Sequence, residues 1–130
     1  MERSNDTIKV LIIEDDQETV EVVSLAFQMR WPEANLVSAK MGEEGIELVA
    51  SESPDAVILD LGLPDISGFE VLRRIRRFSE VPVLILSVRR DEANIVRALE
   101  YGADEYVTKP FRQLQMLARV KALAQRKAVT

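Results

Sequence analysis

The sequence has neither cysteine nor histidine among its 130 residues. Without cysteine the chain can form no disulfide and no thiolate metal site. Without histidine it has no imidazole metal ligand, no Ser-His-Asp triad and no phosphohistidine of its own. Any chemistry must therefore use carboxylates, hydroxyls, lysine or arginine.

Long hydrophobic runs are also missing. The apolar runs are only a few residues long, far below the ~20 that a membrane-spanning helix needs. The segment Met1 to Asp6 lacks the apolar stretch of a signal peptide. We therefore expect a cytoplasmic protein with no membrane partner, and its formal charge of −5 disfavours nonspecific attraction to nucleic acid.

The composition is that of one globular domain. Apolar residues make up 47% of the chain and charged residues 30%, with only five Gly and five Pro. A chain of this length is long enough for one domain with a hydrophobic core and too short for two ordinary ones. We expect disorder at the ends at most.

Five short β-rich runs alternate with amphipathic stretches. The predicted strands are residues 8–13, 35–39, 56–59, 83–86 and 105–108. The predicted helices begin at Asp16 or Gln17, at Gly42, after Ser67, at Asp91 and at Gln113. Several of the runs are apolar on both faces, which is typical of parallel strands. The pattern predicts an α/β fold in three layers, with a doubly wound parallel sheet.

Reactive side chains follow four of the predicted strands. Glu14-Asp15-Asp16 follow the first strand, Asp60 the third, Ser87 the fourth and Lys109 the fifth. In doubly wound folds, sites form at the carboxyl ends of the strands. Taken singly, these residues could be a helix cap, a turn residue, a strand end and a surface lysine. Their joint placement at one sheet edge favours a site.

Clustered carboxylates without His or Cys suit a hard cation, and Mg²⁺ in particular takes a few oxygen ligands together with phosphate oxygens. A carboxylate beside such a cation can attack phosphorus and carry an acyl phosphate. Lys109 and Ser87 would bind the remaining phosphoryl oxygens. The sequence therefore predicts a phosphate-handling site.

These residues resemble a known family, the receiver domain of bacterial two-component response regulators, over Ile8 to Ala124. The resemblance is carried by Leu11-Ile12-Ile13-Glu14-Asp15-Asp16, by Ile58 to Gly68, by Pro82-Val83-Leu84-Ile85-Leu86-Ser87 and by Tyr106-Val107-Thr108-Lys109-Pro110-Phe111. It implies the flavodoxin-like, CheY-like strand order 2-1-3-4-5. It also implies that a separate histidine kinase supplies the phosphoryl group.

By this resemblance Asp60 is the phosphoacceptor. Asp15, Asp60 and the backbone carbonyl of Gly62 would ligate Mg²⁺, with Glu14 acting through water. Lys109 would clamp the phosphoryl group. No other cofactor is implied.

The resemblance also implies a conformational switch. Ser87 would move toward the phosphoryl oxygen and Tyr106 would change rotamer with it, which is a population shift and not a new fold. The Lys109-Pro110 bond is expected to be cis, which only proline makes inexpensive.

Within the family, Gly102 to Tyr106 and the Pro110-Phe111 pair resemble the OmpR/PhoB class, whose members carry a winged-helix DNA-binding domain. Asp60 to Asp65 with Leu86 to Arg89 is similar to the KdpE group of that class. We therefore predict a disordered tail over residues 1–7, a receiver domain over 8–124 and the start of a linker over 125–130. DNA would be bound only by the absent output domain.

Members of this class pair through the fourth helix, fifth strand and fifth helix. Glu105 and Arg119 could keep one salt bridge of this interface. Ile95 and Gln115 occupy places where the class has a basic and an acidic residue, so a second salt bridge is lost without leaving an unpaired charge. We expect a homodimer in which Ile95 enlarges the apolar contact.

Two further functions stay open from the residues. A phosphatase of the haloacid dehalogenase type also uses a strand-end Asp, but it needs an Asp-x-Asp motif. Gln17 and Gly62 occupy the second positions after Asp15 and Asp60. A stand-alone receiver that acts by protein contacts alone is the other alternative. The favoured prediction is a phosphorylation switch that is not an enzyme acting on an external substrate.

Overall fold

The structure is a computed structural model that describes residues 7–129, with no description of the side chains of residues 127–129. Residues 1–6 of the predicted tail lie outside the described residues. The strands are β1 (Lys9–Ile13), β2 (Asn35–Ala39), β3 (Ala56–Leu59), β4 (Val83–Ser87) and β5 (Glu105–Thr108). The helices are α1 (Gln17–Arg30), α2 (Gly42–Glu52), α3 (Gly68–Arg76), α4 (Glu92–Glu100) and α5 (Gln113–Val129).

All five strands lie in one parallel sheet with the order β2-β1-β3-β4-β5. The three central strands are almost wholly buried, which explains why they are apolar on both faces. The predicted fold class and strand order are therefore confirmed. The strand order reverses between β1 and β3, so the edge beyond their carboxyl ends is the switch point where such folds form sites.

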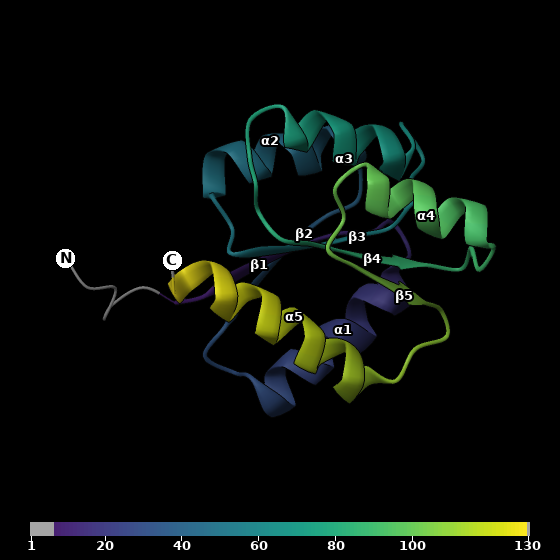
Figure 1. The fold of residues 1–130 in the computed structure, drawn as a ribbon. Helices are drawn as coiled ribbons and strands as arrows, with labels where there is room; N and C mark the ends of the chain where they lie inside the picture. Colours follow the sequence, from purple (N-terminus) through teal and green to yellow (C-terminus); the bar gives the residue numbers. More distant parts are fainter. Residues whose placement is uncertain (1–6, 130) are drawn as a thin grey trace.

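The helices cover both faces of the sheet. Figure 1 shows α2, α3 and α4 on one face and α1 and α5 on the other, which gives three layers. Alternate strand residues divide the core accordingly, because successive side chains of a strand point to opposite faces. Leu11 and Ile13 pack toward α2 and α3, whereas Val10 and Ile12 pack toward α1 and α5.

Three helices begin with a side chain that accepts from their own first turn. Asp16 accepts from the Thr19 N–H in α1, Ser67 from the Glu70 N–H in α3, and Asp91 from the Asn94 N–H in α4. These are caps of the kind expected for Asp and Ser. The predicted starts at Asp16 and after Ser67 are confirmed, and Asp91 is the cap immediately before α4.

The turn between α4 and β5 is tied to the end of α3 by a half-buried guanidinium. Arg76 donates to the carbonyls of Gly102, Ser79 and Val81. Gly102 has a φ of 110°, which favours glycine, and a Cβ there would lie 2.9 Å from Arg76 Nε. Burial lowers the pKa of Arg76.

Helix α5 continues to Val129, past the point at 125 where the linker is predicted to begin. The assignment of residues 125–130 to a linker stays a prediction. No helix within residues 7–129 is both long enough and apolar enough to cross a membrane.

Candidate functional site

The carboxyl ends of β1, β3, β4 and β5 surround a cavity of about 380 Å³. Its lining consists of Glu14, Asp15, Asp16, Asp60, Gly62, Ser87, Val88, Arg89 and Lys109. The sheet thus brings together the reactive side chains that follow separate strands in the sequence. The charged groups of its lining include four carboxylates, the Arg89 guanidinium and the Lys109 ammonium.

Three carboxylates form the acidic part of the cavity. One oxygen each of Glu14, Asp15 and Asp60 lies within 4.8 Å of the other two. Glu14 is 2% exposed and Asp60 8% exposed, whereas Asp15 is open to solvent. Carboxylate oxygens at this spacing fit a hard divalent cation that keeps some of its waters.

The Lys109 ammonium faces this cluster. Its Nζ lies 2.7 Å from Glu14 Oε1 and 3.8 Å from Asp60 Oδ1. Burial raises the pKa of Glu14, and the hydrogen bond from Lys109 opposes this increase. The lysine therefore compensates one negative charge of a cluster that holds three.

Ser87 and Tyr106 are connected through the backbone of one residue, Arg89. The Arg89 N–H donates to Ser87 Oγ at 3.1 Å, and the Tyr106 hydroxyl donates to the Arg89 carbonyl at 2.8 Å. Ser87 is 1% exposed and is the last residue of β4. If the Ser87 hydroxyl moved, the Arg89 N–H would lose its hydrogen-bond acceptor. The carbonyl of the same residue accepts the Tyr106 hydroxyl, so the two side chains are connected.

The loop after β4 forms the solvent side of the cavity. Val88 lines the cavity although 68% of its surface is exposed. The Arg90 guanidinium donates to the Lys109 carbonyl at 3.2 Å, next to the cis Lys109-Pro110 bond that the sequence predicts. This loop is therefore attached to both β5 and the segment that follows it.

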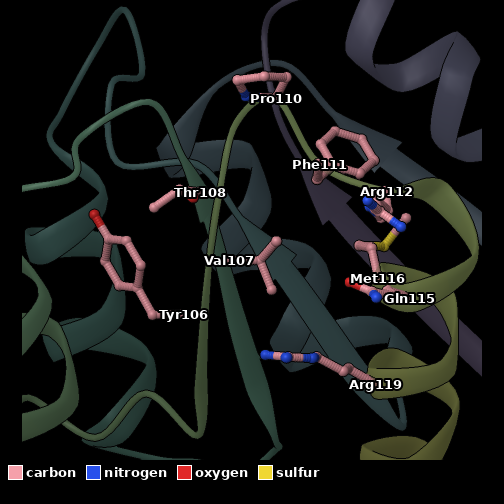
Figure 2. Close-up of a pocket in the computed structure, with 9 residues that line it drawn as sticks. All are labelled: Tyr106, Val107, Thr108, Pro110, Phe111, Arg112, Gln115, Met116 and Arg119. Atoms are coloured by element: carbon pink, nitrogen blue, oxygen red, sulfur yellow. The ribbon is translucent and has the colours of Figure 1, made fainter.

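A second hollow, of about 280 Å³, lies between β5 and α5. Figure 2 shows Gln115, Met116 and Arg119 on the α5 side of β5, while Tyr106 points away to the opposite side of the strand. Arg119 pairs with Glu105 at 3.2 Å within the same chain. Of the predicted interface residues, Gln115 and Arg119 line this hollow, whereas Ile95 and Glu105 do not. Ile95 lies half-buried on α4.

Two residues near the cavity have contacts that the sequence analysis did not predict. Arg89 connects the two predicted switch residues, and Asp65 accepts from the backbone at the start of α2. Both stand in segments that carry the family resemblance. The bond from Tyr106 to Arg89 and the bonds to Asp65 join residues 17 or more positions apart, so no local pattern identifies them.

Comparisons with known proteins agree with this geometry. Residues 10–121 match the response regulator receiver domain family. Over 117 residues, the chain is 40% identical to the transcriptional regulatory protein KdpE of Mycobacterium tuberculosis and 38% identical to the transcriptional regulatory protein AfsQ1 of Streptomyces coelicolor. Each match covers 90% of this chain and 51% of the relative, so the chain spans about half the length of these relatives.

A solved structure gives the same result. The BeF3-activated DrrB receiver domain is 34% identical in sequence and superposes with a TM-score of 0.82. That match covers 92% of this chain and 99% of the DrrB chain. The likeness therefore extends over almost the whole fold, including the strand ends that surround the cavity.

Proposed function

Because this chain belongs to the response regulator receiver domain family, with OmpR/PhoB-class regulators such as KdpE among its relatives, we propose that Asp60 accepts a phosphoryl group from a histidine kinase. The observation that carries the proposal is the position of Asp60. Its carboxylate is nearly buried at the end of β3, within 4.8 Å of two other carboxylates and 3.8 Å from the Lys109 ammonium. An aspartate that served only as a turn residue would be expected at the solvent-exposed surface, away from other charged groups.

The proposed transfer uses the residues at hand. An oxygen of Asp60 attacks phosphorus of a kinase phosphohistidine that carries a proton on its other ring nitrogen. The new P–O bond forms, the P–N bond breaks with its electron pair on nitrogen, and the histidine leaves as neutral imidazole. Lys109 lies close enough to bind a phosphoryl oxygen while it remains paired with Glu14. This chain is thus a receiver domain that promotes its own modification, not a conventional enzyme.

Glu14, Asp15 and Asp60, with the Gly62 carbonyl, would hold Mg²⁺. When bound, the ion neutralises charge that would otherwise repel the incoming phosphoryl group. The side chains fit this role because they offer oxygen ligands alone and because one of them is open to solvent, so that waters can remain.

We propose that the Ser87 hydroxyl turns toward the phosphoryl group after transfer. The Arg89 N–H would then lose its acceptor, and the loop that accepts the Tyr106 hydroxyl bond would shift. This is a change in population between two arrangements of one fold. Helix α4, which follows this loop, would move with it.

The movement of α4 would change the surface through which the domain contacts its partners. We propose homodimerisation through α4, β5 and α5, with Ile95 and Gln115 in the contact and Glu105 and Arg119 providing its charges. We further propose that the chain controls an attached DNA-binding domain in the cytoplasm. The relatives' names as transcriptional regulators, and the half of their length that this chain does not cover, support an output domain.

The test is the intact mass of the protein after treatment with acetyl phosphate or beryllofluoride, with and without Mg²⁺. We expect a single Mg²⁺-dependent adduct on the parent protein and none on Asp60→Asn. Asp91→Asn, which changes an exposed helix-capping aspartate, is the matched control and should keep the adduct. An adduct that persists in Asp60→Asn would disprove the assignment.

A further inference from the structure

The start of α2 has no capping side chain of its own. Met41 occupies the N-cap position and makes no side-chain hydrogen bond to the helix. Asp65, in the loop between β3 and α3, supplies the cap instead. Its Oδ1 accepts from the Gly42 N–H at 2.8 Å and its Oδ2 from the Glu43 N–H at 2.9 Å. Both carboxylate oxygens are therefore used to attach this loop to α2.

Apolar contact reinforces the attachment. A Cβ on Gly42 would lie 2.7 Å from Ile66 Cγ1, so glycine is what allows Ile66 to pack directly against the first turn of α2. Ile66 is the neighbour of Asp65. The tip of the β3–α3 loop is thus held by polar and apolar contacts to the same helix end.

The base of the same loop is held as well. The Gly68 N–H donates to the Leu61 carbonyl at 2.9 Å, and a Cβ on Gly68 would collide with the backbone of Asp60 and Leu61. The loop therefore leaves Asp60, passes Gly62, attaches to α2 at Asp65 and returns to its own start. Gly62 lies between the two fixed points and lines the site cavity, with its Cβ position 3.9 Å from Asp60 Oδ2.

We propose that Asp65 is a positioning residue for the metal site: by anchoring the loop on the start of α2, it fixes the Gly62 carbonyl toward the cation. The inference rests on the proposed function, in which Gly62 is a Mg²⁺ ligand. A carbonyl on an unanchored loop would have to be ordered when the ion binds, and that ordering weakens binding. Asp65 touches neither the ion nor the phosphoryl group and acts through the backbone.

Coupling of this kind is reciprocal. If the contact between Asp65 and α2 strengthens Mg²⁺ binding, then Mg²⁺ binding must strengthen the contact by the same factor. The amides of Gly42 and Glu43 should therefore exchange hydrogen more slowly in the presence of Mg²⁺. A general stabilisation of the fold would slow other capped amides equally, and the Asn94 amide, which donates to Asp91 at the start of α4, is the internal control.

The first experiment is calorimetric titration of Mg²⁺ into the parent, Asp65→Ala, Asp65→Asn and Glu43→Gln proteins. We expect Asp65→Ala to bind Mg²⁺ about tenfold more weakly than the parent, which is the smallest loss usual for residues that orient a metal ligand. Asp65→Asn should lose less affinity, because it keeps one acceptor oxygen. Glu43→Gln removes the ion pair between α2 and Arg74 without touching the loop, and should bind as the parent does. Equal affinity of all four proteins would overturn the inference.

The second experiment is hydrogen exchange of the parent protein with and without Mg²⁺, so that it does not depend on a variant folding. The inference is supported if Mg²⁺ slows the exchange of the Gly42 and Glu43 amides more than that of the Asn94 amide. It is contradicted if Mg²⁺ changes the exchange rates of all three amides equally. Asp15→Asn distinguishes a failure of the metal site from a failure of the positioning role. If Asp15→Asn does not reduce Mg²⁺ binding, the proposed metal site is wrong. If Asp15→Asn abolishes Mg²⁺ binding but Asp65→Ala binds Mg²⁺ as tightly as the parent, only the positioning role of Asp65 is wrong.

Discussion

Lys109 and Glu14, which are 95 residues apart in the chain, form an ion pair with 2.7 Å between Nζ and Oε1. The same ammonium is 3.8 Å from Asp60. The lysine is therefore placed between the buried glutamate and the proposed phosphoacceptor, which leaves the cluster of three carboxylates with uncompensated negative charge. Without a cation, we expect repulsion among these carboxylates to reduce the stability of the fold.

Asp60→Asn should raise the free energy of unfolding by about 0.5 kcal/mol in the absence of divalent cations. In a high dielectric, repulsion from two carboxylates about 5 Å away outweighs the attraction of Lys109 by roughly this amount. Mg²⁺ should stabilise the parent by mass action and the variant much less. Urea denaturation in EDTA and in MgCl₂ measures both effects. A variant less stable than the parent in EDTA would contradict this prediction.

Val88 lines the cavity that holds Asp60, and we expect its side chain to narrow the access of small phosphodonors to Asp60. Val88→Ala should therefore increase the rate of labelling by acetyl phosphate about threefold or more, which corresponds to ~0.65 kcal/mol of activation free energy. Val96→Ala changes an exposed valine of α4 that does not line the cavity, and should label at the parent rate. Equal rates for the parent and Val88→Ala would remove the idea.

Arg76 holds three backbone carbonyls at the end of α3 and the α4–β5 turn. Arg76→Ala leaves these acceptors without their cationic donor, and the free energy of unfolding should fall by about 2 kcal/mol or more. The exposed neighbour Arg77 is the control, since Arg77→Ala should change stability by no more than about 0.5 kcal/mol. Chemical denaturation compares the two, and similar losses would show that the Arg76 contacts contribute little.

Acidification should weaken the start of α4. Hydrogen bonds from the Asn94 side chain and backbone hold the pKa of Asp91 below its usual 3.8. A depressed pKa means that the ionised form stabilises the fold above the unfolded pKa, and that this contribution is lost as pH falls through the folded value. In denaturation at pH 6 and pH 3, Asp91→Asn should lose less stability than the parent, because Asn caps without titrating. Equal losses would contradict the assignment.

The dimer contact is tested by light scattering after size exclusion, with beryllofluoride and Mg²⁺. The parent should dimerise, and Ile95→Glu should weaken dimerisation at least about tenfold, or ~1.4 kcal/mol, by placing a charge in the apolar contact. Leu25→Glu alters an exposed leucine of α1 outside the proposed interface and should behave as the parent. A parent that stays monomeric would argue against this interface.

The sequence predicted the strands more sharply than the ends of the helices. The bounds 35–39, 56–59 and 105–108 are those of the structure, and β4 only adds Ser87. Strand patterns are local, since alternation and apolar runs depend on neighbouring residues. The end of α5 could not be predicted in the same way. Gln125 to Lys127 contain no residue that ends a helix, so the sequence gives no local signal for where α5 stops.

The sequence by itself determined the parallel sheet and the residue types at its carboxyl edge, because hydrophobic periodicity fixes the strands and the fold then delivers their ends to one place. Only the tertiary structure decided the pairing: that Lys109 holds Glu14 more closely than Asp60, that Arg89 connects Ser87 with Tyr106, and that Asp65 caps α2. Apart from the bond between Arg89 and Ser87, these contacts join residues distant in the chain, and their geometry depends on how helices and loops pack. No local pattern contains that information.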